Sequence, residues 1–165
     1  MHILLATDAD WIVDEVTAAL GGPDTTFTVC RDGRLVAGVV KDRVPDLAIL
    51  DLQVGSMGGM AITMDLRLDE SSGRAPHVPA IMLLDRTADV FLAQRSGANG
   101  WLIKPLDALR LRRAMMAVTQ GGTFFEGVPS APAAQHAVDP VDDADGDAAE
   151  SEVDVTAEEE AATTG

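Results

Sequence analysis

Four charged side chains stand where short apolar runs of the sequence end. Asp8, Asp51 and Asp85 come at or just after such runs, and Lys104 closes the last one. If these runs are parallel strands, their carboxyl ends meet along one rim of the sheet, which is where ligands bind in such sheets. The pattern therefore indicates a site with three carboxylates and one ammonium group. Acids after strands also serve as ordinary helix caps, so each carboxylate has that alternative role.

Five short apolar segments predict the strands that would carry these side chains. They lie at residues 3–6, 27–30, 47–50, 79–84 and 101–103. Helical stretches follow at about 11–20, 33–44, 60–70, 88–96 and 106–119, with Asp32 and Thr87 placed to cap the second and fourth. Strand and helix alternate five times in about 120 residues, which favours a parallel sheet with helices on both faces.

The charge of the 165-residue chain divides it into two parts. Residues 1–121 hold all 12 basic groups and 15 acidic ones, so their net charge is −3 and they are numerous enough to bury a core. Residues 122–165 hold 12 acidic groups and no Lys or Arg. This acidic, Ala- and Pro-rich tail begins with a small apolar hook at 123–125, and we expect it to be disordered unless it is bound to a partner. The acidic balance argues against nucleic-acid binding, which needs a basic surface.

Other residue types exclude further classes of protein. The single cysteine, Cys30, rules out an internal disulfide and a cysteine-rich zinc site. The three histidines, His2, His77 and His136, lack the spacing of metal ligands. No apolar run approaches the roughly 18 residues of a membrane-spanning helix, and the N-terminus lacks the basic and apolar regions of a signal peptide. We therefore expect a cytoplasmic protein that does not insert into the membrane.

Three motifs occur in the order that is typical of one family. They are LLATD at the first strand, PDLAILDLQVGSMGG around the third and GANGWLIKPLD around the fifth. Together they make residues 1–121 resemble the receiver domain of the response regulators of bacterial two-component systems. The resemblance implies a flavodoxin-like α/β fold, a doubly wound parallel sheet of five strands, in agreement with the alternation of strands and helices. It also implies a signalling domain and not an enzyme.

The same resemblance assigns roles to the residues at the strand ends. Asp51 matches the aspartate that accepts a phosphoryl group, and Lys104 matches the lysine that contacts the phosphoryl oxygens. Asp8, Asp51 and the backbone carbonyl of Gln53 match the ligands of Mg²⁺. A carboxylate can act as the nucleophile of such a transfer, and the transfer needs positive charge around the phosphoryl group.

Several positions depart from the family pattern, and the departures weaken this chemistry. Thr7 replaces the first acid of the metal-binding pair, so Mg²⁺ binding should be weak. Leu84 replaces the hydroxyl residue of the switch, Asp85 replaces the small residue after it, and Trp101 stands at the aromatic switch position. A ligand shifts an equilibrium only through contacts that differ between two states, and Leu84 offers the phosphoryl group no hydroxyl. We therefore expect phosphorylation at Asp51 to be weak or uncoupled.

The last predicted helix carries three basic side chains, Arg110, Arg112 and Arg113. One interpretation is a solvated helix face. The other is a partner surface, because the family often binds partners through its fourth helix, fifth strand and fifth helix. The acidic tail could fold back on this surface, or both could engage the same partner, and salt would weaken either contact.

Residues 84–114 more narrowly resemble an orphan receiver of mycobacteria that is associated with the respiratory NADH dehydrogenase, complex I. This resemblance implies a protein-interaction subunit on the cytoplasmic arm of that complex, peripheral to the inner membrane. No DNA-binding or catalytic domain is evident after residue 121, so we expect an orphan, single-domain receiver. The rival hypothesis is a conventional phosphorelay receiver that accepts phosphate from a histidine kinase at Asp51. A flavodoxin-like enzyme or nucleotide binder is disfavoured, because the glycine fingerprints of nucleotide sites are missing.

Overall fold

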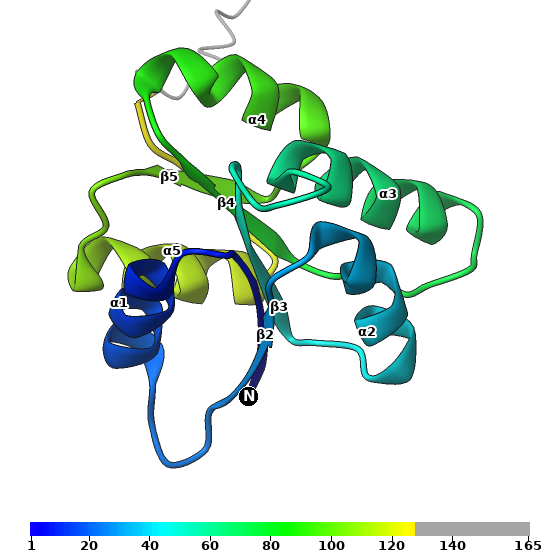
Figure 1. Ribbon diagram of the computed structural model, residues 1–165, viewed down its shortest axis with the longest axis horizontal. Helices are drawn as coiled ribbons and strands as arrows, with labels where there is room; N and C mark the ends of the chain where they lie inside the picture. Colours follow the sequence, from blue (N-terminus) through cyan, green and yellow to red (C-terminus); the bar gives the residue numbers. More distant parts are fainter. Residues whose placement is uncertain (128–165) are drawn as a thin grey trace, which may run out of the picture. The chain divides into compact units, whose positions relative to one another are not determined.

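The computed structural model describes residues 1–127, which form a parallel sheet with helices on both of its faces (Figure 1). The six strands are β1 (His2–Ala6), β2 (Thr26–Cys30), β3 (Leu47–Asp51), β4 (Ala80–Leu84), β5 (Gly100–Ile103) and β6 (Phe124–Phe125). The five α-helices are α1 (Asp10–Leu20), α2 (Val36–Asp42), α3 (Gly59–Ser71), α4 (Val90–Ser96) and α5 (Ala108–Thr119). Short 3₁₀ turns at Gly33–Leu35 and Thr87–Asp89 lead into α2 and α4.

The strand order is β2-β1-β3-β4-β5-β6, and every neighbouring pair is parallel. The chain moves outward from β1 in one direction to β2 and then in the other direction from β3 to β6. Crossover connections of one hand therefore place α1 and α5 on one face and α2, α3 and α4 on the other, as Figure 1 shows. This is the doubly wound α/β fold that the sequence predicts.

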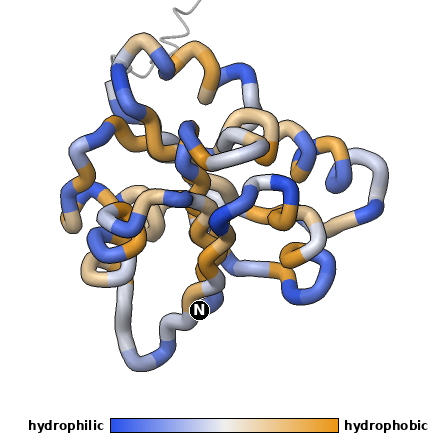
Figure 2. Tube along the Cα trace, in the orientation of Figure 1, coloured by the Kyte–Doolittle hydropathy of each residue, from blue (hydrophilic) through white to orange (hydrophobic). Residues whose placement is uncertain are grey.

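The strands at the centre of the sheet are buried along their whole length. In β1, Ile3 and Leu5 pack toward α1 and α5, whereas Leu4 and Ala6 pack toward α2 and α3. Helices cover both faces, so no position of β1, β3 or β4 can be polar on a solvent side, and their sequences are almost continuously apolar. Figure 2 shows this as a hydrophobic centre with hydrophilic residues on the outer turns of the helices.

Two predicted helix starts have different outcomes. The Asp32 carboxylate accepts a hydrogen bond of 2.9 Å from the backbone N–H of Arg34, so it caps the turn before α2 as expected. The prediction that Thr87 caps the fourth helix is wrong. Thr87 is the first residue of a 3₁₀ turn, and α4 starts only at Val90, with no side-chain cap at either start.

The sixth strand is the main difference from the predicted five-stranded sheet. Phe124 and Phe125, which lie in the expected apolar hook at the start of the tail, pair with Gly100 and Trp101 of β5. Most of the predicted acidic tail, residues 128–165, lies outside the described residues. Within residues 1–127, no helix has the length and apolar character needed to cross a membrane.

The glycine-rich loop after β3 lets α3 begin very close to that strand. A Cβ added at Gly59 would lie 2.5 Å from the backbone oxygen of Asp51, whereas one added at Gly38 in α2 would meet nothing within 4 Å. We expect Gly59→Ala to lower the free energy of unfolding by about 1–3 kcal/mol through overpacking. Gly38→Ala should raise it by up to about 1 kcal/mol, because alanine favours a helix. Urea unfolding followed by circular dichroism measures both, and equal effects would contradict the packing role of Gly59.

Candidate functional site

The carboxyl ends of β3, β4 and β5 bring Asp51, Asp85 and Lys104 together. Asp51 is the last residue of β3 and is only 2% exposed, and Lys104 directly follows β5. The ammonium of Lys104 donates hydrogen bonds to Oδ1 of Asp51 at 2.6 Å and to Oδ1 of Asp85 at 2.9 Å. β4 lies between β3 and β5 in the sheet, so the side chain that follows β4 meets the same lysine.

Both carboxylate oxygens of Asp51 accept hydrogen bonds from the protein. Oδ1 receives the Lys104 ammonium and also the backbone N–H of Gln53 at 3.2 Å. Oδ2 receives the hydroxyl of Thr7 at 2.8 Å, and Thr7 is completely buried at the end of β1. A buried charge is stable only when such partners replace water. Thr7 thus supplies a donor at the position where the resemblance expects the first acid of the metal-binding pair.

Asp85 changes the electrostatics of the site. Burial by itself lowers the pKa of the Lys104 ammonium, but the hydrogen bonds and negative charges of Asp51 and Asp85 outweigh burial, so the pKa is raised above its ordinary value of 10.5. One positive charge therefore faces two carboxylates, and less of its attraction is left for an incoming anion. The sequence placed Asp85 at this rim but gave no sign that it shares the lysine.

Trp11 also lies at the rim, although it is not among the residues predicted for the site. Its ring centroid is 5.7 Å from the Lys104 ammonium, and nearly half of the side chain is exposed. Its position at the start of α1, directly after the β1–α1 loop, was the available signal, since that loop opens onto the same rim.

The residues expected to hold Mg²⁺ do not fit a tight site. Asp8 is exposed, and its Oδ2 lies against the loop after β3, 3.3 Å from where a Cβ on Gly55 would stand. Between residues 1 and 127, Asp8 has no hydrogen bond to Lys104, and no three His, Cys, Asp or Glu side chains gather to hold a metal. The other carboxylate, Asp51, is already bonded to an ammonium and a hydroxyl. Mg²⁺ in proteins is usually held by one or two carboxylates and several waters, and the ion pair of Asp51 competes with it for one of the two carboxylates here, so we expect weak binding.

The two switch positions lie in one apolar cluster. Leu84 is completely buried beside Met82, Val90 and Trp101, so the two positions are linked by hydrocarbon alone. The hydroxyl that bonds Asp51 comes from Thr7, directly after β1, and β1 lies two strands away from β4. Trp101 is 2% exposed, and its indole Nε1 donates to the backbone oxygen of Glu126 at 2.7 Å.

The three arginines of α5 do not share one role. The guanidinium of Arg110 forms an ion pair with Glu126 and donates to the backbone oxygen of Pro105. Arg112 donates from Nε to the backbone oxygen of Ala19, at 2.8 Å, which ties α5 to the end of α1. Arg113 is exposed. Two of the three thus support contacts inside the domain, and the partner surface stays a prediction.

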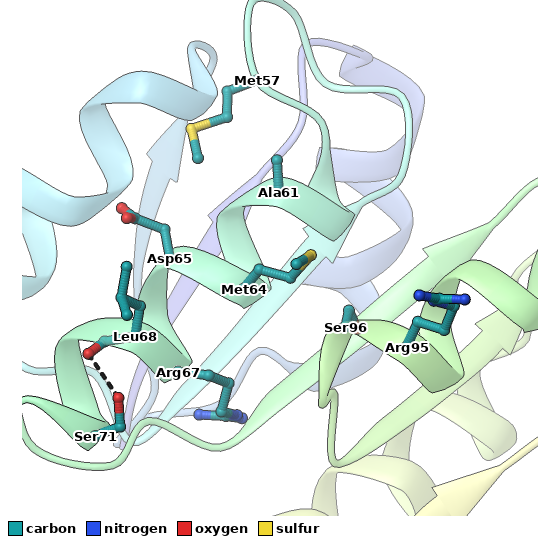
Figure 3. Close-up of a pocket in the computed structure, with 9 residues that line it drawn as sticks. All are labelled: Met57, Ala61, Met64, Asp65, Arg67, Leu68, Ser71, Arg95 and Ser96. Atoms are coloured by element: carbon teal, nitrogen blue, oxygen red, sulfur yellow. Dashed lines mark hydrogen bonds between the residues drawn. The ribbon is translucent and has the colours of Figure 1, made fainter.

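A groove of about 620 Å³ between α3 and α4 lies elsewhere (Figure 3). Its lining is mostly apolar, with Met57, Met64 and Leu68 among the residues shown. Arg67 also lines it, but that guanidinium is already bonded to the backbone oxygen of Gly97 and to Asn99. None of the strand-end charges lines this groove, so the chemistry of the described residues is concentrated at the rim.

The fold and the site together define a signalling domain of the receiver type, with an aspartate and a lysine paired at the strand ends. The family model of the response regulator receiver domain matches residues 3–116, and the chain belongs to this family. The transcriptional regulatory protein CseB of Streptomyces avermitilis is 31% identical over 134 residues, covering 80% of this chain and 54% of that protein. The DNA-binding response regulator MtrA of Mycobacterium tuberculosis H37Rv is 32% identical over 106 residues, covering 63% of this chain and 44% of that protein. The chain spans about half the length of these relatives.

Solved structures of receiver domains share the fold. The receiver domain of NtrX from Brucella abortus superposes with a TM-score of 0.61 at 23% identity, covering 72% of this chain and 98% of that one. The receiver domain of a signal transduction histidine kinase from Syntrophus aciditrophicus gives 0.64 at 21% identity, covering 81% and 98%. At these identities the likeness concerns the fold alone.

The raised pKa of Lys104 makes stability depend on alkaline pH. Because the pKa is higher in the folded state, the stability that this group contributes is present below pH 10.5 and is lost as the pH rises through the folded pKa. The chain has no tyrosine and one other lysine, Lys41. The buried thiol of Cys30, whose pKa is raised by burial, also lowers stability over this range. We expect Lys104→Met to remove the part of the alkaline decline that the ammonium causes, and to cost about 3–5 kcal/mol at neutral pH, because it leaves Asp51 buried without its cation.

Urea unfolding between about pH 9 and pH 12 measures this decline, a range that brackets the ordinary lysine pKa. Lys41→Met is the matched control and should keep the slope of the unmodified chain, since the Lys41 side chain is largely exposed, at 57%. An alkaline slope that Lys104→Met leaves unchanged would show that the ion pair does not titrate as described.

Proposed function

We propose that this chain is an atypical receiver that acts as a protein-interaction module, with weak or uncoupled phosphorylation at Asp51. The observation that carries the proposal is the engagement of Asp51. Its two oxygens already hold the Lys104 ammonium, the Gln53 N–H and the Thr7 hydroxyl. A phosphoryl group could bond to this carboxylate only after one of those contacts is broken.

Charge around Asp51 also opposes the transfer. In a phosphorelay, an oxygen of Asp51 would form the new P–O bond while the P–N bond of a phosphohistidine breaks and the imidazole leaves with the electron pair. The arriving phosphoryl oxygens are negative, and the transfer depends on cations to neutralise them. Here Asp85 places a further carboxylate on the lysine that would do so, and Thr7 offers no carboxylate for a Mg²⁺ ion.

Few contacts could couple phosphorylation at Asp51 to the switch positions Leu84 and Trp101. Leu84 has no hydroxyl to bond a phosphoryl oxygen, and Trp101 is already buried and bonded to Glu126. A phosphoryl group would therefore lack a contact that differs between two positions of Trp101. The surface of the domain is then the same with and without phosphate, as a constitutive binding module requires.

The partner that we propose is the cytoplasmic arm of complex I, with a location in the cytoplasm at the periphery of the inner membrane. The narrower resemblance of residues 84–114 to an orphan receiver associated with that complex supports this assignment. The DNA binding in the name of MtrA belongs to that whole protein, of which 44% is matched. We do not extend it to this chain, whose net charge of −15 disfavours contact with phosphates.

A conventional phosphorelay receiver, served by a histidine kinase, is the alternative. The presence of both Asp51 and Lys104 at the strand ends favours it, because these two residues are the part of the phosphorylation site which the chain retains. Phosphotransfer at Asp51 would then need Thr7 and Asp85 to move aside. The two functions make opposite predictions about phosphoryl analogues and about partner binding.

Beryllium fluoride with Mg²⁺ mimics the phosphoryl group and tests the first difference. We expect weak binding to the unmodified chain and at least about tenfold tighter binding to Thr7→Asp/Leu84→Thr, a difference of about 1.4 kcal/mol. The double variant supplies the missing carboxylate and the missing hydroxyl. Titration calorimetry measures the affinities, and Asp51→Asn should abolish binding in both backgrounds. Equally tight binding to the unmodified chain would favour the conventional receiver.

Affinity purification from the native cell, followed by mass spectrometry, tests the partner. We expect subunits of the NADH dehydrogenase to co-purify in equal amount with the unmodified chain and with Asp51→Ala. The proposed interaction uses a constitutive surface and needs no phosphate. Recovery of a histidine kinase in place of these subunits, or loss of the partner with Asp51→Ala, would contradict the proposal.

A further inference from the structure

The outer edge of β5 is covered by residues 124–127, which we call the edge segment. Phe124 and Phe125 form β6, and the N–H of Phe124 donates to the backbone oxygen of Asn99 at 3.2 Å. The close approach depends on Gly100, since a Cβ there would lie 2.8 Å from the backbone oxygen of Phe124. A strand of two residues forms few backbone hydrogen bonds to its neighbour, so side-chain contacts must also hold it in place.

Glu126 supplies most of the polar contacts of the edge segment. One carboxylate oxygen accepts from the Arg110 guanidinium, and the other accepts from the backbone N–H of Ile103 at 2.7 Å. The backbone oxygen of Glu126 accepts from the indole of Trp101 at 2.7 Å. Three donors from β5 and α5 are thus directed at one acidic residue.

Phe125 supplies the apolar contact. Its ring stacks on the indole of Trp101 with centroids 4.2 Å apart and an interplanar angle of 21°. Phe125 itself is 44% exposed, so its contact with Trp101 holds it to the domain without burying it in the core. Stacked aromatic pairs of this kind add attraction beyond the area that they bury.

These contacts have the composition of a site for an extended peptide. When a peptide binds by adding a strand to the edge of a sheet, main-chain hydrogen bonds give affinity and pockets for its side chains give specificity. Here the anchors are the aromatic platform of Trp101 and the Arg110 guanidinium, which lies beside the backbone N–H of Ile103. They select an aromatic residue followed directly by an acidic one.

We propose that the edge of β5, with Trp101 and Arg110, is a peptide-binding site that the edge segment of this chain occupies in cis. An extended segment of a partner protein with an aromatic–acidic pair would occupy the same site in trans. The tether through α5 keeps the cis ligand at a high effective concentration, which for short linkers is in the millimolar range. A partner segment therefore binds well only when the edge segment is displaced.

The test uses the full chain with Trp11→Phe, which leaves Trp101 as the single tryptophan. In this background, Phe125→Ala/Glu126→Ala vacates the site, and a synthetic peptide of residues 121–127 is titrated while Trp101 fluorescence is recorded. We expect the vacated chain to show red-shifted emission that the peptide reverses. The chain with its own edge segment intact should bind the peptide at least about tenfold more weakly, because the tethered ligand competes.

Two controls match the two anchors. The same peptide with alanine at the positions of Phe125 and Glu126 should not bind, and Arg110→Ala in the vacated chain should weaken binding of the native peptide several-fold. The proposal would be overturned if Trp101 emission did not change when the site is vacated. It would also be overturned if Arg110→Ala left peptide binding unchanged, or if the peptide bound equally well to the vacated chain and to the chain with its edge segment intact.

A milder variant keeps the test valid if the vacated chain does not fold. Glu126→Gln retains an oxygen acceptor but loses the charge that pairs with Arg110. We expect the Ile103 amide to exchange its hydrogen several-fold faster, while amides at the centre of the sheet keep their rates, because local opening does not require global unfolding. Unchanged exchange at Ile103 would overturn the assignment of Glu126 as an anchor.

Discussion

The buried ion pair between Asp51 and Lys104 is the constraint around which the rim is arranged. Taking two charges out of water is costly, and the attraction between them repays that cost only when every remaining hydrogen-bonding position is filled. Thr7 and the Gln53 N–H fill the positions on Asp51, and Asp85 fills one on Lys104. The contacts that stabilise the pair also leave fewer free groups on Asp51 and Lys104 for a ligand.

The sequence predicted the fold well because its central strands are buried on both faces. Runs such as residues 3–6 and 47–50 contain no polar side chain, so their class could be inferred without knowledge of their neighbours. β6 could not be inferred in this way. Two phenylalanines have no periodicity. Their strand pairing is supported by the stacking on Trp101 and by the ion pair of Glu126 with Arg110, and both Trp101 and Arg110 are distant from them in sequence. Thr87 failed as a cap for a related reason, since a local 3₁₀ turn displaced the start of α4.

In the site too, features set by the local sequence could be predicted, whereas features set by tertiary contacts could not. The ends of the strands were enough to place Asp51, Asp85 and Lys104 at one rim, but the direction of Asp8 depends on the loop that contains Gly55. For the arginines of α5, their spacing along the helix already indicates that they do not share one surface. Successive residues of a helix turn by 360°/3.6, or about 100°, so Arg110 and Arg112 point in nearly opposite directions. One contacts Glu126 and the other contacts the end of α1.

β5 connects the rim to the outer edge of the sheet. Its four residues pair with β4 on one side and with β6 on the other, and Lys104 follows immediately. The N–H of Ile103, one residue before Lys104, is bonded to Glu126, and the N–H of Lys104 is bonded to the backbone oxygen of Leu84. Any shift of Lys104 away from Asp51 that moves the backbone must therefore break a contact on one side of β5. A strand held on both sides in this way keeps Lys104 in one position relative to Asp51.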